Sequence, residues 1–216
     1  MTAPQAPPRR QTWGRPVLLA AVPVAYAGLL LFHPVPGAGS IQHGLDHHLT
    51  TWTVVHVAQL GFIGAMGGVI LLLVHGLTAR SATAARVSAV VFVLVYGAYE
   101  TWTGIATGAL TASAHGLRAD EQATAAELIQ THWDSPLLGN GSAGAIAGSA
   151  AWLVATVAAA LALRGRGAPT GAAVALAGAG VVFTPTHVPP AGPLAMLLFA
   201  LAVICLERGR RTGTLR

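Results

Sequence analysis

The chain alternates long apolar runs with short segments that are polar, basic or rich in proline and glycine. A membrane-crossing helix needs roughly 20 mainly apolar residues at about 1.5 Å per residue. Six runs approach or exceed that length, at 16–32, 52–77, 84–110, 136–163, 170–183 and 193–206. The fifth is short and built from Ala, Gly and Val, so we expect it to lie buried among the others. The pattern predicts an all-α bundle of six transmembrane helices over residues 16–206.

Both ends of the chain are basic. Residues 1–15 are also rich in proline, and we expect a disordered segment there. Residues 207–216 should form a basic cytoplasmic tail. A secretory signal peptide is an alternative interpretation of the first run, because a basic start and an apolar core are followed by the small residues 37–40. We favour a retained helix, since the run is long enough to span a membrane.

The longest stretch between two runs, 112–135, has a helical pattern of its own. Asp120 and Glu121 open it, and apolar residues follow at helical spacing. This pattern predicts a short amphipathic helix on the outer face of the membrane. Ser135 and Pro136 are typical of a helix start, with serine as the N-cap and proline at the first helical position. We therefore expect the fourth span to begin there.

Composition and charge support a membrane location. Hydrophobic residues make up 54% of the chain and charged residues 9%, and the mean hydropathy is +0.63. All twelve basic residues are arginine, and the isoelectric point near 10.7 could suggest nucleic-acid binding. Eleven of these arginines, however, fall in four segments that alternate with uncharged or acidic ones, and only Arg118 does not. The positive-inside rule then predicts a multi-pass cell-membrane protein with both termini cytoplasmic, whose partner is the bilayer and not nucleic acid.

Glu100 is the anomaly in the third run. A carboxylate at membrane depth costs roughly 2.5–3.5 kcal/mol, so it is tolerated where it faces a bundle interior, a wet cavity or a partner. On a helix, Tyr96, Thr103 and Thr107 share its face. We therefore expect Glu100 to point inward. His56 in the second run should lie at a similar depth and is the expected partner.

Histidine is distributed asymmetrically. In the expected topology eight of the nine histidines lie on or near the outer face. Imidazole can move protons and bind metals. With Glu100, four of the histidines could converge on an outward-facing pocket between the first, second, third and fifth spans and supply metal ligands: His33, His56, His132 and His187. The cofactor stays unknown, with a transition metal or haem as the alternatives. The loop residues 43–48 are either a solvated segment or a labile metal site.

The same pocket predicts roles for individual residues. Glu100 would act as a general acid or base with His56 as its partner, and Tyr96 and Tyr99 would shape the site. Polar and aromatic side chains nearby are candidate substrate contacts: Gln59, Trp102, Thr103 and Asn140. Three functions stay open, namely an intramembrane enzyme acting on a lipid-soluble small molecule, a proton-coupled transporter or accessory subunit, and a metal or haem carrier. No phosphate-binding loop, nucleophile elbow or paired Asp-rich motif is present in the sequence.

Glycines four residues apart predict close helix packing in the second, third and fourth spans, at Gly64 and Gly68, Gly104 and Gly108, and Gly144 and Gly148. Such pairs serve contacts within a bundle or between subunits, so the oligomeric state is left open. The stretches 52–59 and 92–108, with YGAYE at 96–100 and GIATG at 104–108, resemble an uncharacterised family of small multi-spanning bacterial membrane proteins. The resemblance covers the second and third spans and implies no activity, substrate or cofactor.

Overall fold

The structure is a computed structural model that describes residues 14–37 and 39–213. The expected disordered segment therefore lies largely outside the described residues, although residues 14 and 15 already belong to the first helix. The helices, in chain order, are α1 (Gly14–Leu30), α2 (Ile41–Leu45), α3 (Leu49–Leu73), α4 (Arg80–Glu100), the π-helical segment η1 (Thr101–Ala106), α5 (Thr107–Ala114), α6 (Ala119–Trp133), α7 (Ala143–Arg164), α8 (Thr170–Phe183) and α9 (Ala191–Arg211).

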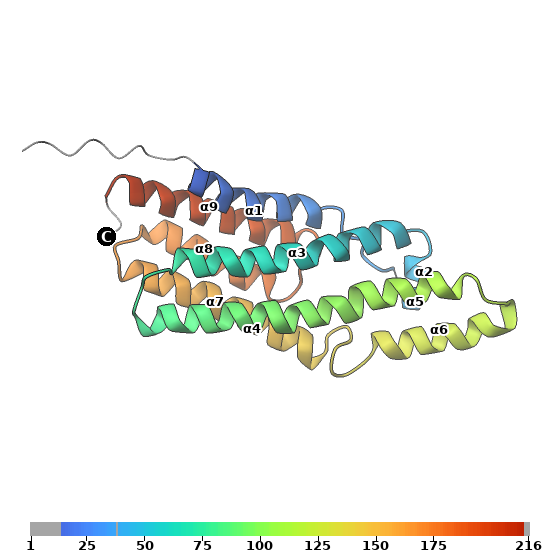
Figure 1. Cartoon of the computed structure of the whole chain (residues 1–216). Helices are drawn as coiled ribbons and strands as arrows, with labels where there is room; N and C mark the ends of the chain where they lie inside the picture. The colour runs from blue at the N-terminus through green and yellow to red at the C-terminus, as the bar shows by residue number, and fades with distance from the viewer. Residues whose placement is uncertain (1–13, 38, 214–216) are drawn as a thin grey trace, which may run out of the picture.

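Six of these helices pack side by side in a closed ring. Contacts join α1 to α3, α3 to α4, α4 to α7, α7 to α8, α8 to α9, and α9 back to α1. The long helices run roughly parallel to one long axis, while α2, α5 and α6 gather at one end (Figure 1). α6 packs on α2 and α5 and buries only Ile129 along its length. A helix therefore lies where the sequence predicts one, and it packs beside α5 at one end of the bundle (Figure 1).

Four helices among the described residues are long and apolar enough to cross a membrane: 49–73, 80–114, 143–164 and 191–211. α1 and α8 are apolar but shorter, with 17 and 14 described residues. At about 1.5 Å per residue, α8 is about 21 Å long, less than the roughly 30 Å of a bilayer's hydrocarbon core. The structure thus establishes an all-helical protein with at least four candidate spans.

The interior of the ring is filled by aromatic and small side chains. Trp152 is central, with ring centres 4.9 Å from Phe92, 5.8 Å from Phe183 and 5.5 Å from Phe199. Glycine allows close approach at only some of the expected positions. A Cβ atom at Gly64 or Gly68 would meet no neighbour within 4 Å, whereas one at Gly67 would overlap Val93 of α4. The expected Gly64 and Gly68 contact is wrong, because residue spacing identifies a small-residue stripe but not the helix face that meets a neighbour.

Arginines cap one end of α3. The last carbonyls of a helix have no partner within the helix, and cations there also interact favourably with its dipole. Arg15 donates to Leu72 O at 3.3 Å and Arg210 to Leu73 O at 2.8 Å. Arg210 also pairs at 2.5 Å with Glu207, which is only 5% exposed. The expected basic tail is thus largely the end of α9, which continues to residue 211.

Two helix boundaries differ from the expectation. α7 begins at Ala143, with the Ser142 hydroxyl accepting from the Ala145 amide at 3.3 Å, and not at Pro136. The intervening turn includes Gly141 at φ +67°, a conformation that glycine adopts without strain and that stops a helix. The third span is longer than expected, since α4, η1 and α5 form one continuous helical rod over 80–114.

Candidate functional site

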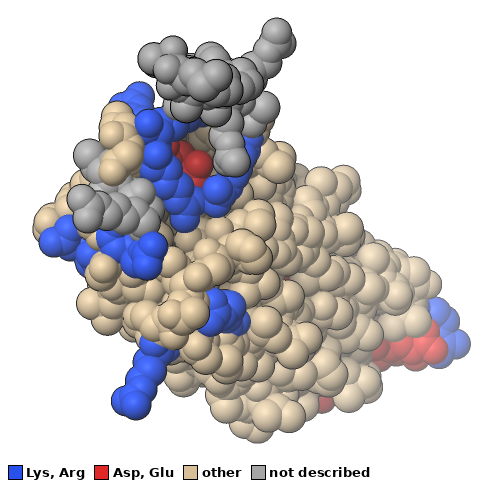
Figure 2. All heavy atoms as spheres, turned by 60° about the vertical axis from the view of Figure 1, so that its left-hand side comes forward, with Lys and Arg blue, Asp and Glu red and all other residues tan. Residues whose placement is uncertain are grey.

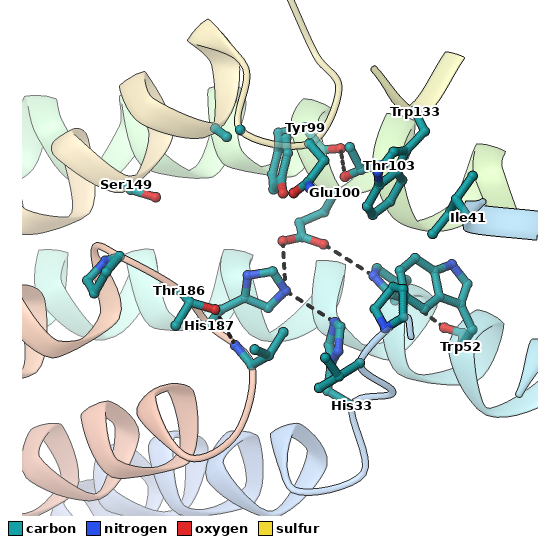
Figure 3. Close-up of a pocket in the computed structure, with 18 of the residues that line it drawn as sticks. His33, Ile41, Trp52, Tyr99, Glu100, Thr103, Trp133, Ser149, Thr186 and His187 are labelled. Atoms are coloured by element: carbon teal, nitrogen blue, oxygen red, sulfur yellow. Dashed lines mark hydrogen bonds and ion pairs between the residues drawn. The ribbon is translucent and has the colours of Figure 1, made fainter. Parts of the chain in front are cut away.

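Three histidines and one glutamate meet near one end of the ring. His56 Nε2 lies 3.7 Å from Glu100 Oε2, and His187 Nε2 lies 3.6 Å from Glu100 Oε1. His187 Nε2 is also 3.2 Å from His33 Nε2. Figure 3 shows the Glu100 carboxyl group pointing between these imidazoles, with His33 and His187 reaching in from opposite loops. His33, His56 and Glu100 are 6%, 2% and 1% exposed, so the cluster is buried.

The backbone around each histidine explains its position. α1 ends at Leu30, and the prolines that follow at 34 and 36 stop the helix and direct the chain across the bundle. His187 lies in the turn between α8 and α9. That turn packs against Gly192, where a Cβ atom would overlap the His187 carbonyl group. The two loop histidines are therefore held where the helix ends bring them together.

The Nδ1 atom of each imidazole ring already has a hydrogen-bond partner outside the cluster. Nδ1 of His33 lies 2.8 Å from Pro34 O, and Nδ1 of His56 lies 2.8 Å from Trp52 O. A carbonyl oxygen only accepts, so in both rings Nδ1 carries a proton and donates it. Nδ1 of His187 lies 2.8 Å from the Tyr96 hydroxyl, which can accept or donate. In their neutral forms, His33 and His56 therefore direct a bare Nε2 lone pair into the cluster.

Burial favours neutral imidazoles in the two loops. It lowers the pKa of His33 below its ordinary value. It also lowers the pKa of His187, an effect increased by the neighbouring His33 and His56. Desolvation disfavours a charged ring and leaves the neutral form, which is the form that binds metals.

Glu100 is followed directly by the π-helical segment. Its Oε1 atom is buried and has no hydrogen-bond partner among the described residues. Within the segment, the Gly104 carbonyl accepts a hydrogen bond from Trp52 Nε1 at 2.7 Å. A π-bulge interrupts the regular ladder of a helix and often occurs at functional sites. Trp52 is 2% exposed and contacts the bulge from α3.

A cavity of about 510 Å³ opens above the cluster. This is within the usual range for small-molecule sites, roughly 300–1,000 Å³. Aromatic rings and uncharged polar groups make up much of its wall: Trp52, Tyr96, Tyr99, Thr103, Gln130, Trp133, Asn140, Ser149 and Thr186. Several of these side chains are labelled around Glu100 in Figure 3. The cavity thus has a strongly polar floor and largely aromatic sides.

The structure brings together most of the sequence-predicted residues but not all. Tyr96, Tyr99, Thr103 and Asn140 line the cavity with the cluster, whereas Gln59 is fully buried and does not. Two further candidates lie outside it and contact each other. The rings of Trp102 and His132 stack with centres 4.3 Å apart, and each donor nitrogen reaches the other's carbonyl oxygen. His132 is therefore not placed to act with the other three histidines.

The sequence analysis did not identify Trp133 as a wall of the cavity. It also missed Thr186, although this residue adjoins His187 and might have been found on that ground. Elsewhere, the Asp46 carboxyl group lies 3.0 Å from His115 and 4.0 Å from His43, so the histidine loop is tied to the end of α5. In residues 14–37 and 39–213, no group of three or more His, Cys, Asp or Glu side chains satisfies the geometry of a metal site as it stands.

These features define a helical protein with membrane-length spans and a buried cluster of three histidines and one glutamate beneath a cavity. No family model, curated protein or solved structure matches the chain.

Proposed function

We propose that the protein binds one divalent transition-metal ion through His33, His56, Glu100 and His187, at the floor of the cavity. The observation that carries this proposal is the direction of the lone pairs. The unprotonated Nε2 of His56 lies 3.7 Å from one carboxyl oxygen of Glu100, His187 Nε2 lies 3.6 Å from the other, and the unprotonated Nε2 of His33 lies 3.2 Å from His187 Nε2. Acceptors that face one another in a buried place repel unless a cation lies between them.

The outer contacts of the rings support the same proposal. A metal-binding histidine commonly donates its other N–H to a backbone carbonyl, a carboxylate or water, which fixes the tautomer and the ring orientation. His33 and His56 have such a carbonyl contact at 2.8 Å each. With a metal bound, His187 would donate from Nδ1 to the Tyr96 oxygen in the same way. Each imidazole is thus already oriented by a second group.

Three of the separations between the proposed ligands can be compared with those of a tetrahedral ion. Four ligands at about 2.0–2.2 Å from a tetrahedral ion lie about 3.3–3.6 Å from each other. The three measured separations are 3.2, 3.6 and 3.7 Å. The donor atoms do not yet surround one point, so binding would draw the four side chains together around the ion. This closure reconciles the proposal with the absence of a finished metal geometry among the described residues.

The donor set favours some metals over others. Imidazole nitrogens with one carboxylate suit zinc, iron, nickel or copper, and the absence of thiolates disfavours the softest ions. Haem fits poorly. The ring centre of His33 lies 4.9 Å from that of His56 and 4.8 Å from that of His187. These distances leave no room for a haem macrocycle between His33 and either of the other two rings. We therefore propose a single ion coordinated by side chains.

An intramembrane acid/base enzyme is the second candidate. It is favoured by a continuous chain of contacts, Tyr96 OH to His187 Nδ1 at 2.8 Å and His187 Nε2 to His33 Nε2 at 3.2 Å. If Tyr96 donates to His187, then His187 donates to His33, and protons can move along the chain without a metal. This account leaves His56 Nε2 and Glu100 3.7 Å apart, beyond hydrogen-bond distance. The metal accounts for all four groups, and a proton-coupled transporter remains a weaker prediction.

The membrane arrangement that we propose keeps six spans with both termini cytoplasmic. The arginine-bearing ends of α1, α4, α7 and α9 would then lie inside, in accord with the positive-inside rule. The histidine cluster lies toward the opposite end of the bundle, so its cavity would open outward. A metal ion could reach the site from the outer side without crossing the apolar core.

Metal binding can be tested on the full chain purified in detergent. The protein would be treated with a chelator, dialysed, and titrated with Co²⁺ and Zn²⁺ while visible absorption and bound metal are measured. We expect one ion per chain with an absorption spectrum of low-symmetry Co²⁺. Glu100→Gln and His187→Ala should weaken binding at least 100-fold. The matched control is His132→Ala, since this ring lies outside the cluster.

Two outcomes would overturn the proposal. In the first, the wild-type protein binds no more Co²⁺ or Zn²⁺ than the double variant His56→Ala/Glu100→Gln does. The other is a variant series in which only His43 or His115 matters, which would place the ion in the exposed loop. A metal-free protein whose activity on a small molecule depends on Tyr96 and His187 would support the acid/base enzyme instead.

A further inference from the structure

The end of the bundle opposite the histidine cluster is strongly cationic. Eight arginines of the described residues lie there, with Glu207 as the single acidic residue: Arg15, Arg80, Arg86, Arg164, Arg166, Arg208, Arg210 and Arg211. Figure 2 shows their side chains gathered around this end, while the acidic side chains of the far end cluster apart from them. Arg15, Arg86 and Arg210 are used in capping α3 and its following turn. In the part of the chain that the structure describes, the other five arginines do not cap α3 or its following turn.

Two apolar grooves lie on either side of the last turns of α9. The groove between α1 and α9 has a volume of about 400 Å³ and includes the small residues Ala20 and Ala21. The groove between α8 and α9 has a volume of about 490 Å³ and includes Gly171 and Ala172. Small residues on the partner helices leave both grooves open. Both grooves are lined mainly by apolar atoms, as a hydrocarbon chain requires.

Arg208 belongs to both grooves. Its side chain is exposed, and no ion pair or side-chain hydrogen bond of this arginine occurs within the described part of the chain. The groove residues extend from Arg208 back to Leu201 on α9 and from Pro16 to Val24 on α1. At about 1.5 Å per residue, these lengths are about 10 and 12 Å, which is most of one leaflet of a roughly 30 Å hydrocarbon core.

We propose that an anionic phospholipid straddles α9, with its phosphate on Arg208 and one acyl chain in each groove. The charge and the two apolar paths start from the same residue, which matches a headgroup that carries two chains. Basic pockets between transmembrane helices on the cytoplasmic side are known to bind anionic headgroups. Guanidinium also binds phosphate through two parallel hydrogen bonds. The proposal is independent of metal binding at the other end.

The test uses native mass spectrometry of the full chain in detergent. Dioleoyl phosphatidylglycerol and dioleoyl phosphatidylcholine, which have the same acyl chains, would be added at equal concentration. We expect the anionic lipid to be retained at least threefold more than the zwitterionic one. Arg208→Gln should remove this preference, and Gly171→Trp, which fills one groove, should reduce retention of both lipids. Arg80→Gln is the matched control, an exposed arginine of the same end that lines neither groove.

The outcomes separate a lipid site from a general attraction. Equal loss of preference in Arg80→Gln and Arg208→Gln would overturn the proposal, because it would show a diffuse charge effect. So would displacement of the lipid by millimolar inorganic phosphate combined with unchanged retention in Gly171→Trp, because an anion site without chain contacts would then explain the binding. Unfolding of a variant is recognised by its charge-state distribution, and Ala21→Trp then tests the α1 groove in its place.

Discussion

Replacing Gly104 by alanine should disable the site without touching any of its four proposed ligands. Gly104 lies in the π-helical segment, and its α-carbon faces the His56 ring of α3. A Cβ atom there would overlap three atoms of His56, the ring atoms Cδ2 and Cγ and the side-chain Cβ. We expect the chain to fold and metal affinity to fall at least 100-fold, which corresponds to about 2.7 kcal/mol.

The magnitude follows from the contact distances. The most distant of the three atoms, His56 Cβ, would be 2.8 Å from the new methyl group. Non-bonded carbons pack at about 3.5 Å or more, so even this atom must move by about 0.7 Å. Metal–ligand bonds tolerate deviations of about 0.2 Å. The imidazole cannot keep its bond to the ion under such a displacement. Overpacking also costs about 1–3 kcal/mol of folding stability.

The control is Gly97→Ala, seven residues earlier in the same rod. A Cβ atom at Gly97 would meet no neighbour within 4 Å. Alanine in a helix interior is normally about 0.5–1 kcal/mol more favourable than glycine, so this variant should melt no lower than wild type and bind metal normally. The assay is isothermal titration of chelator-treated protein with Zn²⁺. A Gly104→Ala variant that binds within threefold of wild type would refute the reasoning, since His56 would then not be a ligand in this position.

Three further results are expected. Arg210→Ala removes the closer of two ion pairs of the buried Glu207 and a cap of α3, while Arg15 stays 3.7 Å from Glu207, so thermal denaturation should show a loss of about 1.5–3 kcal/mol, with Arg80→Ala near wild type. Burial lowers the pKa of His187 in the folded state. The unfolded chain therefore takes up a proton first as pH falls below about 6.5, and the melting temperature of the metal-free protein should decrease from pH 7.5 to pH 5.5. Tyr96→Phe removes the oxygen that orients His187, and Zn²⁺ affinity should fall about 10–100-fold by titration.

The meeting of Glu100 with His56 could be predicted from the sequence. A carboxylic acid inside an apolar run must face inward, and two residues at equal depth on consecutive antiparallel helices are brought within reach of each other. The same reasoning placed His33 and His187 nearby, because both follow the outer ends of apolar runs. The boundaries of the apolar runs indicate how deep each of these four residues lies along the bundle. This depth was enough to predict that the four residues lie near one another.

The side of the bundle toward which a residue points at a given depth could not be predicted in the same way. His132 has the right depth but faces Trp102 on the far side of the π-helical segment. The bulge itself leaves no trace in a hydropathy pattern, because it changes the backbone ladder and not the residue types. Trp102 does not line the cavity although Thr103 does, because two residues after Glu100 correspond to about 200° around a helix and three residues to about 300°. α7 begins later than predicted because a turn precedes Ser142. Pro136 lies before this turn, and its resemblance to the first residue of a helix was misleading.

The four proposed ligands come from parts of the ring that are far apart in sequence, at positions 33, 56, 100 and 187. Three of them are attached to α1, α3 and α4, which are consecutive in the ring, and the fourth follows α8 on its opposite side. An ion bound to all four would therefore connect the two sides of the ring at the end where the cavity leaves it open. Because the unfolded chain has no such site, binding would favour the closed ring by about 4 kcal/mol at a free metal concentration 1,000 times Kd. Metal binding and folding of the bundle are thus linked, and a substitution that weakens metal binding should also reduce the stabilisation that the metal provides.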